Sequence, residues 1–205
     1  MFGGSFNPIH FGHLLVADDI AETLALDRVL FVPAAVPPHK PVSELAPAVH
    51  RVAMTRLAVA EHPRFEVSDV ELRRRGPSYT VDTLESLRPL GDLHLIIGSE
   101  TFLDLLSWHE PRRLPGLARL VVVPRSGNAF DPKAPAAQKV LAELALGPFS
   151  PPGEEGRVVL TQAASLPISG SDLRRRARTG RSLAYRMPTA VIAYIREHGL
   201  YRDAS

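Results

Sequence analysis

The sequence predicts an α/β protein with a doubly wound, mostly parallel sheet and helices on both of its faces. Short apolar runs alternate along the chain with stretches of helical apolar spacing, and a glycine pair separates the first apolar residues from the first helical stretch. The chain of 205 residues is long enough to bury one core. Because such sheets bind ligands at the carboxyl ends of their strands, we expect the site at the glycine turn.

The first strand is expected to be short. Only Met1 and Phe2 precede the glycines, whereas a buried strand of this kind has about five residues. Either the central strand is clipped or the natural start lies upstream. Residues 12–26 follow as a helix, because their apolar positions recur at helical spacing, and the apolar run 29–32, ended by Pro33, predicts a buried strand.

The later elements continue this alternation. Apolar runs predict strands at residues 65–72, 94–97, 120–123 and 158–160. Helical spacing predicts helices at residues 49–61, 81–87, 101–107, 112–117 and 136–146, with two more helices closing the chain. We expect one domain over residues 1–205, with a helical C-terminal part of about 169–205 packed on it.

Composition excludes several classes of protein. The apolar share of 45% and the charged share of 22% are those of a globular chain, and a net charge of +2 argues only weakly for a polyanionic partner. The chain has no cysteine, which excludes a disulfide framework and thiol catalysis. No stretch approaches the ~20 apolar residues of a membrane span, and no basic leader precedes an apolar run. A cytoplasmic protein without a membrane partner is expected.

The first fourteen residues have the pattern of an anion site. Gly3 and Gly4 allow the backbone to pass close to a ligand, and the first helical turn offers unused N–H groups. His10 and His13 are three residues apart, so both imidazoles can reach one phosphate group. A structural helix start is the alternative. A zinc site is less favoured, because zinc needs more ligands and the chain has no cysteine.

Four later residues carry candidate chemistry. Lys40 stands on a proline-stiffened loop, where it can be held near an anion, and Thr80 or Ser78 can cap the helix at 81–87. Trp108 is the only tryptophan, and such a residue is more often core than ligand platform. Arg174 follows a turn of small residues about one helical turn beyond Ser171, the expected N-cap. The arginines around it also raise the alternative of RNA binding, whereas those at 73–75 are expected on a solvated face.

These segments resemble a known family. His10-Phe11-Gly12-His13 is similar to the (His/Thr)-x-Gly-His signature of Rossmann-like nucleotidyltransferases, a pattern that class I aminoacyl-tRNA synthetases share. Together with the segments at 37–40, 77–84, 98–108 and 166–174, which occur in the same order, it resembles the nicotinate-nucleotide adenylyltransferases. In three positions the chain departs from that pattern: Glu100 replaces Asp, Gly170 replaces Ser, and Ser171 replaces Thr.

The resemblance implies roles for particular residues. The catalytic group would be His13, His10, Arg174 and Lys40. The residues that would bind ATP are Gly3, Gly4, Ser5, Phe6, His10, Gly12, His13, Gly98, Glu100, Ile168, Ser169, Gly170, Ser171 and Arg174. Those that would bind nicotinate mononucleotide are Ser5, Lys40, Thr80 and Trp108.

The resemblance also implies the reaction, in which the phosphate of nicotinate mononucleotide attacks the α-phosphorus of ATP. Mg²⁺ would bridge the phosphates, held largely by ATP and water rather than by a protein metal site. Nicotinamide-mononucleotide or phosphopantetheine adenylyltransferase is the same-class alternative, and a non-catalytic RNA- or nucleotide-binding module is the different-class one. A tRNA synthetase is disfavoured, since 205 residues leave no room for an anticodon-binding region. No nucleic-acid partner is expected, and the oligomeric state is not predicted.

Overall fold

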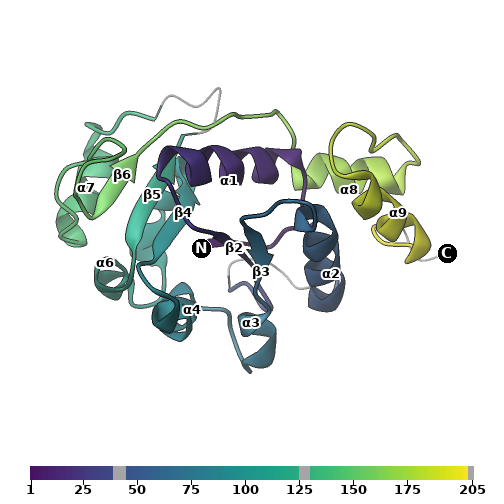
Figure 1. Cartoon of the computed structure of the whole chain (residues 1–205), viewed down its shortest axis with the longest axis horizontal. Coiled ribbons are helices and arrows are strands. Elements are labelled where there is room, and N and C mark those ends of the chain that lie inside the picture. Colours follow the sequence, from purple (N-terminus) through teal and green to yellow (C-terminus); the bar gives the residue numbers. More distant parts are fainter. Residues whose placement is uncertain (39–44, 125–129, 203–205) are drawn as a thin grey trace.

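A parallel sheet with the strand order β3-β2-β1-β4-β5-β6 forms the centre of the molecule (Figure 1). The computed structural model describes residues 1–38, 45–124 and 130–202. The strands are β1 Phe2–Gly4, β2 Val29–Pro33, β3 Phe65–Val67, β4 His94–Gly98, β5 Arg119–Val123 and β6 Val158–Leu160. Their order reverses between β1 and β4, and such a reversal opens a crevice at the carboxyl ends of the strands.

Helices cover both faces of this sheet. They are α1 Phe11–Thr23, α2 Ala48–Val59, α3 Val70–Arg73, α4 Thr80–Leu87, α5 Ser99–Leu103, α6 Leu114–Leu117, α7 Pro135–Glu143, α8 Gly170–Arg178 and α9 Thr189–Glu197, with 3₁₀ turns η2 Arg88–Leu90, η3 Leu105–Ser107 and η4 Pro111–Arg113. In β4, Leu95 and Ile97 join one core cluster with α4 to α7, while Ile96 joins a second with α1, α2, α8 and α9. This alternation confirms the doubly wound α/β class.

The strand predicted at residues 65–72 is wrong beyond Val67. The amide of Ser68 still donates to the Phe31 carbonyl at 2.9 Å, which ends the pairing with β2. The Ser68 hydroxyl then accepts a hydrogen bond from the Val70 amide at 3.3 Å, and the chain enters the short helix α3. Such local bonds of a serine hydroxyl compete with a strand. The turn of α3 buries Glu71. The pattern that predicted a strand gave no sign that this carboxylate would be buried.

The helix predicted at residues 101–107 is divided into α5 and the 3₁₀ turn η3, with Asp104 between them. Other predicted elements are present with shifted ends. The first strand is short, as expected, with three residues that include both glycines. The helices predicted to reach residues 26 and 146 end earlier, at Thr23 and Glu143. In each case an alanine shortly after the helix, Ala25 or Ala145, has a positive φ of about 50°, and a left-handed residue at this place ends a helix.

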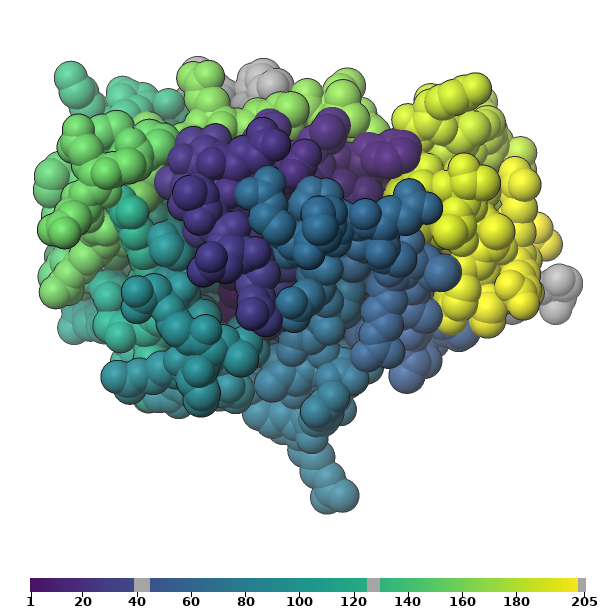
Figure 2. Space-filling model, in the orientation of Figure 1, coloured from purple at the N-terminus to yellow at the C-terminus, as the bar shows by residue number. Residues whose placement is uncertain are grey.

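The C-terminal helices α8 and α9 lie together at one side of the molecule, beside α2 (Figure 1). The Tyr194 hydroxyl on α9 lies 2.9 Å from Nδ1 of His50 on α2. In the space-filling view the yellow C-terminal surface meets the blue surface of the segment that contains α2 (Figure 2). Within the part of the chain that the structure describes, no helix has the length and apolar character needed to cross a membrane.

Candidate functional site

The turn that follows β1 lies where the strand order reverses. Phe2 is in register with Ile96 of β4, and the two strands end two residues later, at Gly4 and at Gly98. Gly98 is the N-cap of α5, and Glu100 is exposed in the first turn of that helix. The segments predicted to hold the nucleotide from β1 and from β4 therefore adjoin at the expected edge of the sheet.

Phe6 anchors this turn in the core. Its φ of 41° lies in the left-handed region, a conformation that surrounding packing must hold in a bulky residue. The ring is 2% exposed, and its centroid lies 5.8 Å from the ring of Phe2 and 5.1 Å from that of His13, edge to face. The buried ring of Phe6 thus packs edge to face against the ring of His13. Any contact between Phe6 and a nucleotide would therefore come from the Phe6 backbone.

His10 and His13 form a stacked pair at the start of α1. Their ring centroids are 3.8 Å apart with the planes inclined by 30°. The amide of His10 donates to Nδ1 of His13 at 3.3 Å. Because Nδ1 accepts this bond, neutral His13 carries its proton on Nε2. His13 can therefore offer Nε2–H as a donor to an anion without becoming charged.

Gly12 leaves the space that His10 occupies. A Cβ atom at Gly12 would lie 3.0 Å from Nδ1 and 3.1 Å from Cε1 of His10, closer than side chains normally approach. The carbonyl oxygen of Leu166 would lie 3.9 Å from the same Cβ. The segment before α8 therefore passes over the histidine motif, and the two signatures, far apart in the sequence, meet here.

Arg174 of α8 reaches the same turn. Its Nη1 donates to the carbonyl of Asn7 at 3.0 Å. A Cβ atom on Gly170 would also come within 3.0 Å of that carbonyl oxygen and 3.4 Å of Arg174 Nη1. The departure from Ser to Gly at 170 thus coincides with close packing of α8 on the turn at Asn7.

The N-cap of α8 is Ser169, so the expectation of Ser171 as the cap is wrong. The Ser169 hydroxyl accepts from the Asp172 amide at 3.2 Å and lies 3.2 Å from the hydroxyl of Ser171. Ser169 has the extended backbone of a cap, whereas Ser171 is already inside the helix. The preceding Ile168 packs against the second core cluster.

Arg174 differs from the arginines that follow it. Nε of Arg176 bonds Asp172 at 2.7 Å, and Arg175 bonds the other oxygen of the same carboxylate. The hydrogen bond from Arg176, followed in size by that from Arg175, lowers the pKa of the Asp172 carboxyl. Arg175 and Arg176 thus form ion pairs within their own helix, which weakens the RNA-binding alternative. Arg174 instead bonds Asn7 in the turn before His10.

The segments of Thr80 and Trp108 also lie together. The ring of Tyr79, the N-cap of α4, stacks on that of His109 with a centroid distance of 4.1 Å and an angle of 23°. Thr80 is the first residue of α4, so its amide belongs to the turn whose N–H groups a helix leaves unused. Trp108 is half-buried and packs against the first core cluster. Lys40 lies outside the described residues.

Neither Ser78 nor Thr80 caps α4 with its side chain, contrary to the capping expectation. The Ser78 hydroxyl instead accepts from the amides of Ala35 and Val36, at 3.0 Å each. This contact fastens the segment before Thr80 to the end of β2. The start of α4 therefore sits near the carboxyl ends of the central strands, where a ligand is expected.

Sequence reasoning missed Arg51, a nearly fully buried arginine on α2. It is 1% exposed and donates to the carbonyls of Ser5 at 2.8 Å, Ala35 at 3.2 Å and Ala46 at 2.8 Å. Burial lowers the pKa of Arg51, while nearby Tyr201 and Glu71 act to raise it. The signal was its place on the apolar face of the helix, since the neighbouring positions at helical spacing, Val52, Met54, Thr55 and Val59, are also buried.

Glu71 complements Arg51 at the same loop. Its carboxylate accepts from the Ala35 amide at 3.3 Å and from the Thr83 hydroxyl at 2.8 Å. Arg74 donates to that hydroxyl at 3.2 Å and is half-buried. The expectation of a solvated face is therefore wrong for Arg74, whereas its neighbours Arg73 and Arg75 are exposed.

Comparisons with known proteins agree with one another. The family model described as cytidylyltransferase-like matches residues 1–176. The chain is 46% identical to a probable nicotinate-nucleotide adenylyltransferase of Roseiflexus sp., over 98% of this chain and 96% of the relative. It is 48% identical to one of Thermus thermophilus, over 98% of each. A Plasmodium falciparum nicotinic acid mononucleotide adenylyltransferase complexed with NaAD superposes with a TM-score of 0.74 over 98% of this chain and 95% of that one, at 20% identity.

Proposed function

This chain belongs to the nicotinate-nucleotide adenylyltransferases within the cytidylyltransferase-like family, and we propose how its residues carry out the reaction of that family. The enzyme transfers AMP from ATP to nicotinate mononucleotide and forms nicotinate adenine dinucleotide and pyrophosphate. The observation that carries the assignment of residues is that Arg174 bonds the carbonyl of Asn7, three residues before the stacked His10–His13 pair begins.

The chemistry is an in-line displacement at the α-phosphorus of ATP. A phosphate oxygen of the mononucleotide forms the new bond, and the bond to the leaving pyrophosphate breaks. The phosphate of the acceptor is already an anionic nucleophile, so the enzyme needs no general base. Catalysis then depends on alignment and on donors directed at the charge that shifts along the reaction axis.

The histidine pair and Arg174 supply those donors. His13 would direct its Nε2–H to a phosphate oxygen, because its Nδ1 already accepts a backbone bond. The planar guanidinium of Arg174 would bind the β- and γ-phosphates, which leave together as pyrophosphate. The backbone of the turn 3–6 and the first turn of α1 would add N–H groups. Lys40 is proposed to hold the same phosphates.

The adenosine side of the site would be formed across the β1–β4 boundary. Gly98 would leave room for the nucleoside, and Glu100, exposed in the first turn of α5, would bond the ribose. The segment from Ile168 to Ser171 would contact the adenosine and phosphates from the opposite side.

The acceptor would bind between α4 and the segment after η3. Backbone amides near Thr80 would hold the nicotinate carboxylate at the start of α4, and the half-buried indole of Trp108 would stack on the pyridine ring. Stacking of Tyr79 on His109 brings these two segments together, which supports a shared pocket.

Magnesium is proposed to bind together with the substrate ATP. Among the described residues, no group of three or more His, Asp or Glu side chains is arranged to hold a metal ion, and the donors at the turn are N–H groups that suit anions. Mg²⁺ is proposed to enter with ATP, held by the phosphates and water, which suits its preference for keeping several waters. When bound, it would neutralise phosphate charge.

His13→Ala tests the assignment. We expect pyrophosphate release from ATP and nicotinate mononucleotide to fall about 10²- to 10³-fold, the loss typical of removing one donor from a charge-stabilising site, while the circular dichroism spectrum stays unchanged. His62→Ala is the matched control, because His62 also stacks on an aromatic ring, Phe65 at 3.6 Å, but pairs with Asp18 outside the site. A His13→Ala enzyme as fast as the control would overturn the role of His13.

A panel of acceptors tests the substrate. We expect nicotinate mononucleotide to be used with the highest kcat/KM, followed by nicotinamide mononucleotide, and phosphopantetheine not to be used. A preference for the amide would contradict the proposed carboxylate contact at Thr80. Binding to RNA that weakens steeply with salt, without any turnover, would favour the binding-module alternative instead.

A further inference from the structure

Tyr201, close to the C-terminus, reaches the catalytic turn through an unusual backbone path. After α9 ends at Glu197, Gly199 and Tyr201 both have positive φ values, of 59° and 64°. A tyrosine pays a steric penalty in this region, and such residues persist only where the surroundings hold them. Tyr201 is partly buried against the second core cluster, and this packing holds it in the left-handed conformation.

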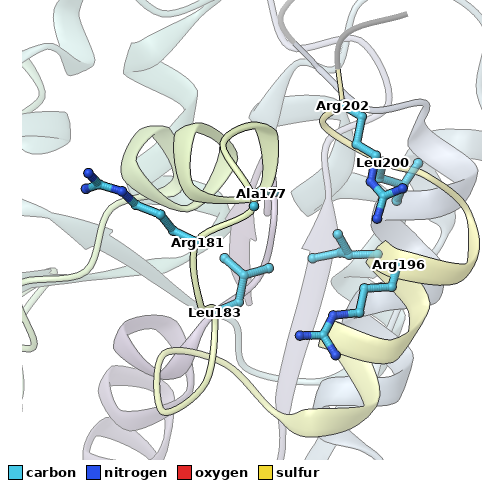
Figure 3. A pocket seen from close by; sticks show the side chains of 8 residues that line it. Ala177, Arg181, Leu183, Arg196, Leu200 and Arg202 are labelled. Atoms are coloured by element: carbon cyan, nitrogen blue, oxygen red, sulfur yellow. The ribbon is translucent and has the colours of Figure 1, made fainter. Parts of the chain in front are cut away.

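The residues on either side of Tyr201 lie beside the C-terminal helices α8 and α9. Leu200 and Arg202 line a pocket between α8 and α9, together with Leu183 and Arg196 (Figure 3). The close-up shows the side chain of Leu183 directed into the space between the two helices. The amide of Leu200 also donates to the Ile195 carbonyl at 3.0 Å. This bond ties the residue before Tyr201 to the end of α9.

The hydroxyl of Tyr201 donates to Oδ1 of Asn7 at 2.9 Å. Asn7 is 5% exposed, and the same oxygen accepts from the Ala46 amide at 3.1 Å. The backbone carbonyl of Asn7 accepts from Arg174 at 3.0 Å. Three distant parts of the chain thus meet at one residue in the middle of the turn that leads to His10.

The protonation state of Tyr201 suits this role. Burial raises the pKa of its phenol, against the opposing effects of Arg174 and Arg51. The phenol therefore remains a donor at any pH at which the enzyme works. Asn7 Oδ1 is an acceptor only, so this bond has one direction and one geometry.

We propose that Tyr201 is a positioning residue for adenylyl transfer, which holds Asn7 and through it fixes the turn that carries His10 and the anchor of Arg174. The inference rests on the function proposed above, because it assigns Tyr201 to the same site. Tyr201 does not need to contact ATP or the mononucleotide. Its hydroxyl makes the C-terminal segment a part of the active-site framework.

Tyr201→Phe tests this role, since it removes the hydroxyl and keeps the ring. Tyr194→Phe is the matched control: its hydroxyl makes a bond of the same length, 2.9 Å, from α9 to His50, outside the site. We expect both variants to lower Tm by a similar few degrees, as for the loss of one bond. Only Tyr201→Phe should lower kcat/KM for ATP, by about tenfold, because small displacements of catalytic groups are costly.

A double-variant cycle separates positioning from general stability. If Tyr201 acts through Asn7, adding Tyr201→Phe to Asn7→Ala should lower kcat/KM no further than Asn7→Ala alone. Losses that multiply, or equal kcat/KM for the Tyr201 and Tyr194 variants, would overturn the proposal. Should His13→Ala be inactive while Tyr201→Phe keeps full activity, the proposed site stands and the inference on Tyr201 alone fails. A fully active His13→Ala enzyme would remove the proposed site itself.

Discussion

Replacement of Gly12 by alanine would set helix propensity against the space that His10, a residue of the proposed site, occupies. Gly12 lies in the first turn of α1, where alanine is favoured over glycine by up to about 1 kcal/mol. The new Cβ would lie 3.0 Å from Nδ1 and 3.1 Å from Cε1 of His10, so the ring must move by a few tenths of an ångström. His10 is 6% exposed and stacked on His13, which leaves little room for this movement.

Crowding and helix propensity both change the free energy of unfolding, whereas displacement of the His10 ring changes the activity. Overpacking of a buried site costs about 1–3 kcal/mol, so after the gain in propensity we expect the free energy of unfolding to fall by ~0–2 kcal/mol in urea titrations. The displaced imidazole should lower kcat/KM for ATP by about tenfold, since a misplacement of 1 Å can cost about a hundredfold. Pyrophosphate release at varied ATP and saturating mononucleotide measures this loss.

Gly116→Ala provides the comparison. Gly116 lies inside α6, and a Cβ there would meet no atom within 4 Å. This variant should be equally stable or more stable than the parent, with unchanged kinetics. A Gly12→Ala enzyme that matches it in both kcat/KM and stability would refute the reasoning, because the position of His10 would then be irrelevant to the reaction or different from the one described.

Two further predictions concern Trp108 in the proposed acceptor pocket and His94 at the start of β4. Trp108→Ala should raise KM for nicotinate mononucleotide more than KM for ATP in steady-state assays; equal effects would assign Trp108 to the core alone. Desolvation, then the charges of Arg119 and the N-terminus, lowers the pKa of His94 from its ordinary 6.5. As the pH falls, the unfolded chain protonates His94 at a higher pH than the folded chain does. The free energy of unfolding should therefore decrease as the pH drops below 6.5. Urea titrations should show a weaker fall for His94→Gln, and identical slopes would contradict this cause.

The buried Arg51 and Glu71 hold the loop that follows β2 beside the proposed site. Arg51 bonds the carbonyl of Ala35 and Glu71 accepts from the amide of the same residue. A buried charge is tolerated only where hydrogen bonds satisfy it. Here the cation is satisfied by backbone carbonyls of three loop segments, so its burial ties those segments to one point.

Much of the fold was readable along the chain. Apolar alternation and spacing depend on local geometry, with periods of 2.0 and 3.6 residues, so they identified the strands, the longer helices and the parallel class. The strand predicted through residue 72 failed where a single serine hydroxyl and a buried carboxylate redirected the backbone after Val67. Side chains that compete with the ladder in this way leave little trace in a periodic pattern.

The residues proposed to face the ligand belong to local motifs, and for this reason the sequence by itself determined the histidine pair, the glycine turn and the second signature with Arg174. Only the tertiary structure decided what holds them. Asn7 accepts hydrogen bonds from Ala46, Arg174 and Tyr201, which lie up to 194 residues away in the sequence. Such bonds form only after the sheet and helices have packed, because they join parts of the chain that share no local periodicity.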